Sequence, residues 1–576
     1  MVQDLDYSSQ VLGGRQAYRV FLPPAYAASQ ARYPVIYWFS GYERSADVDA
    51  YTGQIVDYVA THDAIVVKSG PVETTGVYPL CFPELVDHID RTLRTVADRD
   101  HRAVSGYLAG GFFAFLVAGR NPDLVSSASS FLGPTEYSAG PKGFDVEYNL
   151  DDFYGNYDGV RTRLVTETGQ FLGFYHRRLN AIWNSARDSH QTENFDSTEP
   201  TPELAKTFDF HLHEFARPSP KPAVFNHADV YPNFTVWGWE VGSARRRPGV
   251  TVLQDVSETG FRSAVREWIP GGALLPEVKL SIASAAVFAP GSSHMVTYLR
   301  LRDGYARRAP IRADAQGRLN FELDGDEYQV GISAAPLIAI TGYRIADAAW
   351  ATAGEPLKLA IQFSNVGAGP SRPTDIRWEC TDPGVKFDVW TSHLAGLAPG
   401  ESATIPVTIT GTGPARWFLR FVAVSGATRL PVGVPLFPHA DATKVFQIAD
   451  GATVDVMRRA VATADVTFGE GNHDGHAAPG ESFAILVPDG EMLRAAELFT
   501  NDACVDNGVR GADSWSEYDH SGASVKYSLP RIRKECDPGH VIHFLARVTI
   551  PHAPDHETRY LAIDVPVWWR PGEEPK

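Results

Sequence analysis

Residues 104–118 read VSGYLAGGFFAFLVA, and this stretch decides the fold of the first part of the chain. It predicts the end of a buried strand, a sharp glycine turn and the first turns of an apolar helix. Gly106, Gly110 and Gly111 have the spacing of the G-x-S-x-G nucleophile elbow, in which a tight turn raises a serine hydroxyl above the sheet. The elbow position holds Leu108, whose isobutyl group has neither a proton to give up nor a lone pair for attack.

The sequence around this stretch alternates short apolar strands with amphipathic helices. Strands are predicted at 18–22, 33–39 and 64–67, and helices at 55–61 and 85–97. This alternation is typical of a doubly wound, mostly parallel sheet. We therefore expect an α/β domain over residues 1–235.

Several segments resemble one known family. Tyr18–Pro24 (YRVFLPP), Pro34–Gly41 (PVIYWFSG), the helix before the elbow and Ser105–Asn121 look like the esterase D or feruloyl-esterase-like family of α/β-hydrolases. The resemblance covers about residues 10–235. It implies a serine nucleophile, a late histidine, an acid after a late strand and an oxyanion hole built from two backbone N–H groups.

The positions that this resemblance assigns are largely altered. Leu108 stands at the nucleophile, and the N–H after it belongs to Ala109. The acid position aligns with Gln170, and Glu167 lies three residues earlier. The early turn, usually His-Gly in the family, is Ser40, Gly41 and Tyr42. The histidine candidate is His227, two residues before Asp229, and the weaker candidates are His176, His211 and His213.

Three functions remain open on these residues. The first is a degenerate esterase-like protein that binds or scaffolds a carbohydrate or another polymer without hydrolysis. The second is an active hydrolase or lyase on glycans or esters, in which His227 with Asp229 or Glu167 acts as general acid or base. The third is a purely structural surface protein.

A lid is expected over about residues 133–222, because this segment is rich in aromatic and acidic residues. Aromatic rings offer stacking faces and carboxylates accept hydrogen bonds from hydroxyls, which suits a sugar. The alternative is a lid that packs on its own rings. The candidate ligand-binding residues are Trp38, Tyr107, Tyr148 and His176.

The remainder of the chain predicts β-sandwiches, because strands alternate between recurring glycine and proline turns. We expect three units, at 236–337, 338–439 and 440–576. The second resembles the immunoglobulin-like modules of bacterial surface proteins, which implies a spacer or adhesion role.

Residues 470–481 have the spacing of an EF-hand calcium loop. Glu470, Asn472, Asp474 and Glu481 fall at positions 1, 3, 5 and 12, with glycine at 6 and His476 at 7. The sequence predicts a structural calcium site here, with a polar hairpin turn as the alternative. No phosphate loop, dinucleotide fingerprint or HExxH occurs, so we expect no catalytic cofactor.

Composition limits the classes of binding partner and the cellular compartments that are expected for this protein. The net charge of −17 argues against nucleic acid and anionic membranes. No run of about 18 apolar residues predicts a membrane span. A secreted or periplasmic bacterial protein is favoured over a cytoplasmic one, since the sandwich train resembles exported proteins. Cys504 and Cys536 fall in one unit and either pair or stay reduced.

Overall fold

A computed structural model defines the fold in two compact units. Unit 1 comprises Met1–Val265, Pro276–Val296 and Arg308–Ser333, and unit 2 comprises Arg266–Leu275, Thr297–Arg307 and Ala334–Lys576. The structure describes residues 1–41, 51–69, 78–141, 146–167, 173–186, 190–195, 204–217, 219–267, 269, 274–413, 418–426, 428–437, 439–442, 446–449, 453–454, 466–467, 471–472, 474–489, 492–495, 497–500, 502, 504–505, 530–537, 539–549 and 558–568.

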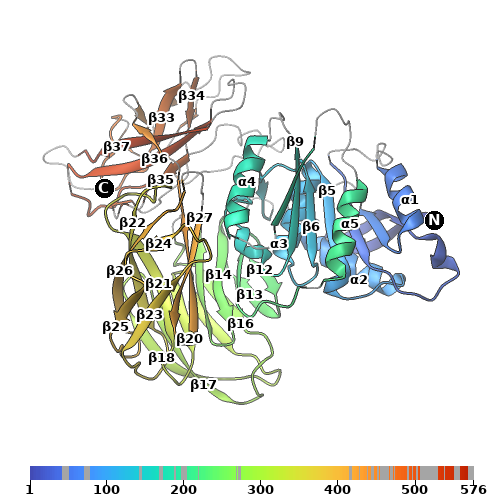
Figure 1. Ribbon diagram of the computed structural model, residues 1–576, viewed down its shortest axis with the longest axis horizontal. Coiled ribbons are helices and arrows are strands. Elements are labelled where there is room, and N and C mark those ends of the chain that lie inside the picture. The colour runs from blue at the N-terminus through green and yellow to red at the C-terminus, as the bar shows by residue number, and fades with distance from the viewer. Residues whose placement is uncertain are drawn as a thin grey trace. The chain divides into compact units, whose positions relative to one another are not determined.

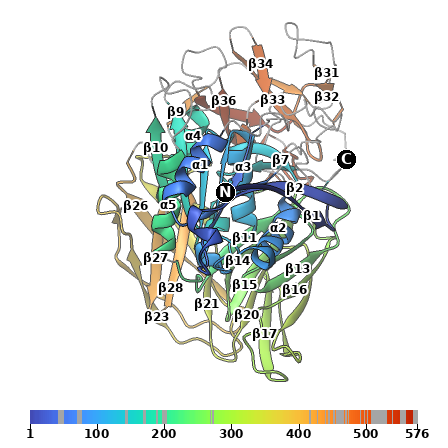
Figure 2. The same ribbon diagram turned by 90° about the vertical axis from the view of Figure 1, so that its right-hand side faces the viewer.

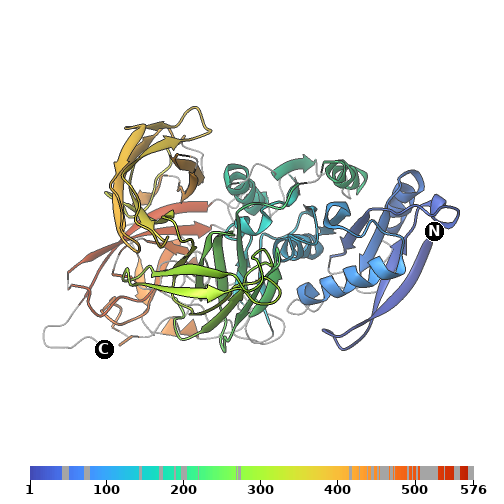
Figure 3. The same ribbon diagram turned by 90° about the horizontal axis from the view of Figure 1, so that it is seen from below.

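Unit 1 begins with an eight-stranded sheet in the order β1-β2-β4-β3-β5-β6-β9-β10. Its last six strands run parallel, and the hairpin β1–β2, blue in Figures 2 and 3, joins antiparallel at one edge. The parallel sheet predicted for the N-terminal part is therefore confirmed. The strands are β1 (Val2–Ser9), β2 (Gly14–Phe21), β3 (Val35–Phe39), β4 (Ile65–Ser69), β5 (Arg102–Tyr107), β6 (Ser127–Phe131), β9 (Arg161–Glu167) and β10 (His190–Phe195).

Helices cover both faces of this sheet. Figure 1 shows α1 and α5 on one side and α3 and α4 on the other. Since β3, β4 and β6 are buried at every position, their sequences show no alternation between apolar and polar residues. The helices are α1 (Thr52–Thr61), α2 (Tyr78–Thr92), α3 (Ala109–Arg120), α4 (Gly173–Ala186) and α5 (Leu204–Phe215), with short 3-10 turns η1 (Pro24–Ala27), η3 (Arg99–His101) and η4 (Tyr154–Tyr157).

Two boundaries expected from the sequence are corrected. The helix predicted at 85–97 occupies Tyr78–Thr92, and it carries Pro83 inside, where a proline normally suggests a helix start. The segment 133–222 is not one lid, because β9, α4, β10 and α5 within it complete the sheet and its cover. Within the described residues of this segment, the elements added to the sheet are η4 and the hairpin of β7 (Glu136–Ala139) and β8 (Val146–Asn149).

A β-sandwich follows in unit 1, and it begins before the expected boundary at 235. Both β11 and β12 pair with sandwich strands rather than with the parallel sheet. The two sheets have the orders β11-β14-β15-β20-β17-β18 and β12-β13-β16-β19. Their strands are β11 (Phe225–Asp229), β12 (Asn233–Val236), β13 (Trp239–Ser243), β14 (Val250–Ser257), β15 (Gly260–Arg266), β16 (Lys279–Ala283), β17 (Ser293–Arg300), β18 (Ala306–Arg312), β19 (Asn320–Asp324) and β20 (Tyr328–Ile332).

Unit 2 is built from further antiparallel sheets. Two four-stranded sheets, β21-β22-β26-β24 and β25-β23-β27-β28, enclose a core around the buried Trp378. Their strands are β21 (Ile338–Ile345), β22 (Leu357–Asn365), β23 (Thr374–Glu379), β24 (Lys386–Phe387), β25 (Thr391–Leu394), β26 (Ser402–Thr410), β27 (Phe418–Ser425) and β28 (Thr428–Pro435).

The last part of unit 2 carries short strands and one disulfide, which joins Cys504 and Cys536. The pairing left open by the sequence is therefore present. The strands are β29 (Asp441–Ala442), β30 (Gln447–Ala449), β31 (Thr453–Val454), β32 (Val466–Thr467), β33 (Ala484–Asp489), β34 (Met492–Ala495), β35 (Glu497–Phe499), β36 (Val541–Thr549) and β37 (Thr558–Pro566). Among the helices that the structure describes, none is long and apolar enough to cross a membrane.

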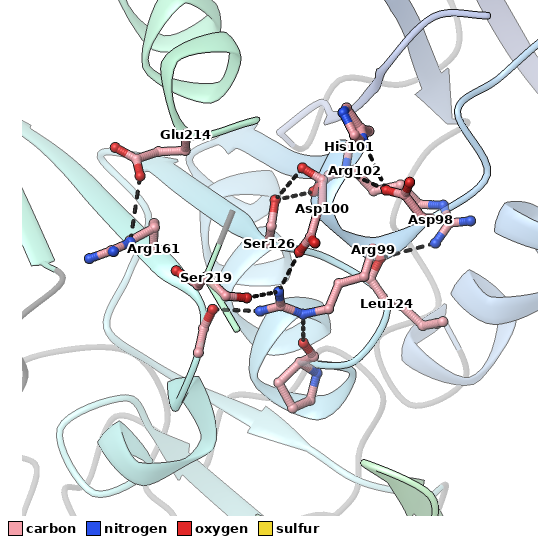
Figure 4. A network of polar contacts seen from close by, with 12 residues as sticks. Asp98, Arg99, Asp100, His101, Arg102, Leu124, Ser126, Arg161, Glu214 and Ser219 are labelled. Carbon is pink, nitrogen blue, oxygen red and sulfur yellow. Dashed lines mark hydrogen bonds and ion pairs between the residues drawn. The ribbon is translucent and has the colours of Figure 1, made fainter. Parts of the chain in front are cut away.

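A polar network ties the amino end of the parallel sheet together (Figure 4). Arg99 donates to the carbonyl of Pro122 at 2.7 Å, to that of Ser219 at 3.0 Å and to that of Gly159. Its guanidinium also lies 5.1 Å from the ring centroid of Trp237, at the start of the sandwich. One partly buried guanidinium, which also pairs with Asp100 at 2.9 Å, thus donates to carbonyls from three separate loops.

We expect Arg99→Met to lower the free energy of unfolding by about 3 kcal/mol, because three carbonyl acceptors lose their donor while the aliphatic bulk is kept. Arg91→Met is the matched control. The Arg91 side chain is 69% exposed and pairs only with Asp87 within α2, so a change below about 0.5 kcal/mol is expected. Chemical denaturation followed by tryptophan fluorescence measures both variants. Equal effects would contradict the role given to Arg99.

Candidate functional site at the carboxyl edge of the parallel sheet

Leu108 occupies the turn between β5 and α3 in a strained backbone conformation. Its φ of 49° and ψ of −122° lie in a region that L-residues with a side chain rarely adopt. The turn is fixed by backbone hydrogen bonds, since the Leu108 N–H donates to Phe131 at 2.9 Å and the Gly111 N–H donates to Leu108 at 2.8 Å. This is the geometry in which an elbow presents its central side chain at the carboxyl edge of a sheet.

The glycines beside Leu108 are required by close backbone approach. A Cβ added to Gly106 would lie 2.0 Å from the Gly110 carbonyl oxygen. A Cβ added to Gly110 would lie 2.2 Å from the carbonyl oxygen of Phe39 at the end of β3. The start of α3 therefore packs directly on β3 and β5, and this contact holds the turn.

The turn after β3 lies beside the elbow, as expected for an oxyanion hole. A Cβ added to Gly41 would lie 3.5 Å from the Leu108 Cβ and 3.2 Å from the Tyr107 carbonyl oxygen. Ser40 is buried. Ala109 opens α3, and the first N–H groups of a helix have no partner within it. The structure thus brings Ser40, Gly41, Leu108 and Ala109 together, whereas Tyr42 lies outside the described residues.

Of the two residues considered for the catalytic acid, Glu167 is described in its backbone alone. Glu167 ends β9 at the same sheet edge, two strands from β5, or about 10 Å at the usual strand spacing. Gln170 lies outside the described residues. The sequence that connects β10 to α5, residues 196–203, contains no histidine. In a sheet of this topology the late histidine follows the acid in chain order, so the sequence supplies none at this connection.

His176 is not a ligand-binding residue, because it is fully buried. Its Nε2 lies 2.8 Å from the Gly133 carbonyl oxygen and its Nδ1 lies 3.1 Å from the Thr166 hydroxyl. The carbonyl accepts only, so Nε2 carries the proton and Nδ1 accepts from the threonine. Burial lowers the pKa of this ring. His176 joins the ends of β6 and β9 and is a structural residue.

His211 bridges two strands from beneath the sheet. Its Nε2 lies 2.7 Å from the Ser105 hydroxyl on β5, and its Nδ1 lies 2.8 Å from the Ser127 hydroxyl on β6. Burial lowers the pKa of His211 to about 3. A sequence signal for this role existed, since His211 shares the buried face of α5 with Leu204, Phe208 and Phe215. His213, on the same helix, is a partly exposed neighbour of Glu214.

The structure does not bring His227 to the elbow. His227 lies in β11 of the sandwich, fully buried, with its Nε2 3.9 Å from Asp229 Oδ2. Asp229 in turn pairs with Arg120 at 3.1 Å, and Arg120 is the last residue of α3. Since Leu108 precedes the first residue of that helix, the pair lies about 18 Å away along the helix axis. The expectation failed because β11 pairs with β14 instead of extending the parallel sheet.

The aromatic candidates form core rather than an open platform. Trp38 is fully buried and packs edge-on against Tyr51 at 5.3 Å and Phe208 at 6.1 Å. Tyr107 is half-buried, with its ring 5.5 Å from Tyr51. Tyr148 is buried and stacks on Phe153 at 3.7 Å. Within the segment 133–222, Tyr148 therefore packs both on Phe153 and on Phe112 of α3, whose ring centroid is 6.0 Å away.

The calcium loop is described in part, because Glu470 lies outside the described residues. Asn472 and Asp474 accept hydrogen bonds from the N–H groups of Asp474 and His476, both at 2.9 Å. Glu481 accepts from the N–H groups of Asn472 at 3.0 Å and Ala478 at 3.3 Å, and His476 stacks on Trp568. These oxygens cap backbone turns within the described loop. The calcium site stays a prediction.

The mixed, mostly parallel sheet and the strained turn between β5 and α3 resemble the α/β-hydrolase fold. No protein-family model matches the chain. Over 143 residues the chain is 31% identical to an esterase of Mycobacterium tuberculosis (strain H37Rv), covering 22% of this chain and 31% of that protein. Over 157 residues it is 27% identical to an endo-1,4-beta-xylanase/feruloyl esterase of Xylanibacter ruminicola, covering 23% and 22%. The chain thus spans less than a third of the length of each of these relatives.

Solved structures also resemble a part of the chain. A ferulic acid esterase is 19% identical with a TM-score of 0.31, covering 37% of this chain and 98% of its own. An S-formylglutathione hydrolase of Staphylococcus aureus is 16% identical with a TM-score of 0.28, covering 37% and 97%.

We expect Gly106→Ala to destabilise the protein by about 3 kcal/mol, because the new methyl group meets backbone atoms that cannot withdraw. The control is Gly53→Ala near the start of α1, where an added Cβ meets no atom within 4 Å. That change is expected to be neutral or to stabilise by up to about 1 kcal/mol. Urea denaturation compares the two. A neutral Gly106→Ala would show that the helix does not pack on the strand as described.

His211 gives the fold a defined pH dependence. Its folded pKa lies below that of an unfolded histidine, so between about 6.5 and about 3 the unfolded state binds the extra proton. The histidine therefore costs stability as the pH falls through this window, at up to about 1.4 kcal/mol per pH unit. We expect His211→Gln to flatten the loss of stability between pH 6.5 and 4.5 relative to the unchanged protein. Denaturation at stepped pH measures the slope, and identical slopes would contradict the assignment.

Proposed function

We propose that the chain is a catalytically degenerate esterase-like protein that binds or scaffolds a carbohydrate or similar polymer without hydrolysing it. The observation that carries this proposal is Leu108 in the elbow conformation, with φ 49° and ψ −122°. Covalent ester hydrolysis needs a hydroxyl or thiol at this point to attack the carbonyl carbon. A hydrocarbon side chain cannot form the acyl-enzyme bond.

The surroundings of Leu108 support the same reading. The Ser105 hydroxyl, three residues before Leu108, is buried and contacts His211. His227 is buried near the far end of α3, with an aspartate that already pairs with Arg120, so general acid–base chemistry by His227 on a bound substrate lacks solvent and substrate access. These contacts argue against a hydrolase or lyase that uses His227 as its general acid or base.

The rest of the chain supports a binding or scaffolding role outside the cytoplasm. The described strands after the parallel sheet are mostly antiparallel, and β-sandwiches built from such strands commonly act as spacers or adhesive modules. The Cys504–Cys536 disulfide favours an oxidising compartment. The similar protein of Xylanibacter ruminicola is named an endo-1,4-beta-xylanase/feruloyl esterase, which supports a polysaccharide as the polymer.

We expect no hydrolysis of p-nitrophenyl acetate or methyl ferulate above the buffer rate. The variant Leu108→Ser is expected to restore at most a single slow acylation without turnover, because the connection after β10 supplies no histidine to act as base. Stopped-flow and steady-state absorbance at 405 nm for the nitrophenyl ester would measure both proteins. Multiple turnovers by the unchanged chain would overturn the proposal.

A further inference from the structure

A cleft of about 820 Å³ lies within unit 1, away from the elbow. One wall comes from the end of α3 and the loop after it, with Arg120 and Asp123, and another from α2, with Leu80 and Pro83. The floor is the sheet β12-β13-β16-β19 of the first sandwich. The volume falls in the usual range of ligand sites, about 300–1,000 Å³.

Strand register makes the floor a regular polar array. Asn233, Gly242, Ser281 and Glu322 are paired in sequence across the four strands and form one row. Thr235, Glu240, Ala283 and Asn320 form the next row. The residues between these rows, such as Val241 and Ile282, are buried in the sandwich core. One face of the sheet therefore presents hydroxyl, amide and carboxylate groups to the cleft.

The centre of the floor is kept low by small side chains. A Cβ added to Gly242 would lie 2.8 Å from the Ser281 hydroxyl and 3.4 Å from the Asn233 amide oxygen. Polar groups of two neighbouring strands thus converge over a glycine, with Asn233 and Glu322 at the ends of this row. Such a trough accepts an extended ligand laid across the strands.

The charges of the cleft argue against an anionic ligand. Arg120 already pairs with the buried Asp229, and Arg318 pairs with Glu240 at 2.9 Å. The remaining charged groups that line the cleft are the carboxylates of Asp123 and Glu322. Carboxylates accept hydrogen bonds from hydroxyl groups, and the amide groups of asparagine both accept from and donate to them. Leu80 and Pro83 offer apolar contact to the C–H faces of sugar rings.

We propose that this cleft binds a neutral oligosaccharide segment, so that the chain holds a glycan on the sandwich face rather than at the elbow. The ligand class rests on the proposed function, whereas the position of the site rests on the cleft alone. The proposed site would give a function to the contact between α3 and the first sandwich, a contact that the elbow turn does not require.

The test uses the full chain with four neutral hexasaccharides, from xylan, cellulose, mannan and starch, in isothermal titration calorimetry. Ser281→Trp fills the trough from an exposed position of β16, so we expect affinity for the bound hexasaccharide to fall at least about tenfold. Thr404→Trp, at an exposed position of β26, is the matched control and is expected to leave affinity unchanged. Thermal melting checks that both variants fold.

The possible outcomes distinguish failure of the proposed cleft from failure of the proposed binding function. Binding that survives Ser281→Trp would overturn the cleft and leave the proposed function standing. Binding of none of the four hexasaccharides would overturn both. We expect affinity to be the same at low and high salt. Affinity that falls steeply with salt, or binding of spermidine in place of a sugar, would show a cation site and overturn the neutral glycan.

Discussion

The close backbone contact between the start of α3 and the ends of β3 and β5 is the constraint on which the N-terminal part depends. Gly106 and Gly110 leave no room for a methyl group, and their approach forces the residue between them into a positive φ. An L-residue pays roughly 1–2 kcal/mol for such a conformation. The Leu108 side chain has no reactive group that would explain the strain. The conformation persists because the packing of α3 on the sheet fixes the turn.

The same constraint explains how far the sequence predicted the fold. Glycine spacing, a buried strand before it and an apolar helix after it carry local information, so the parallel sheet and its central turn were predictable. The first and last residues of α2 and of the expected lid could not be predicted from such local information. The helix begins at Tyr78 and continues through Pro83, and the length of the segment between the elbow and β11 concealed that two more strands of the sheet lie within it.

The histidines show why the site was harder to predict than the fold. His227 carries a neighbouring aspartate in sequence, which suggested a catalytic pair. Its true neighbours are set by long-range strand pairing with β14 and by an arginine more than a hundred residues earlier, and neither leaves a local signal. His211 did leave a signal, since its position continues the helical spacing of the apolar residues on the buried face of α5. In the structure its two ring nitrogens contact two serine hydroxyls.

We propose that the strained turn at Leu108 is kept as architecture and supplies no nucleophile. The most direct measurement is intact-protein mass spectrometry of the full chain after prolonged exposure to a fluorophosphonate, with an active serine esterase treated in parallel. The account predicts that the mass of the chain stays unchanged while the esterase gains one phosphonyl group. A stoichiometric adduct on any residue of the first 235 would contradict it.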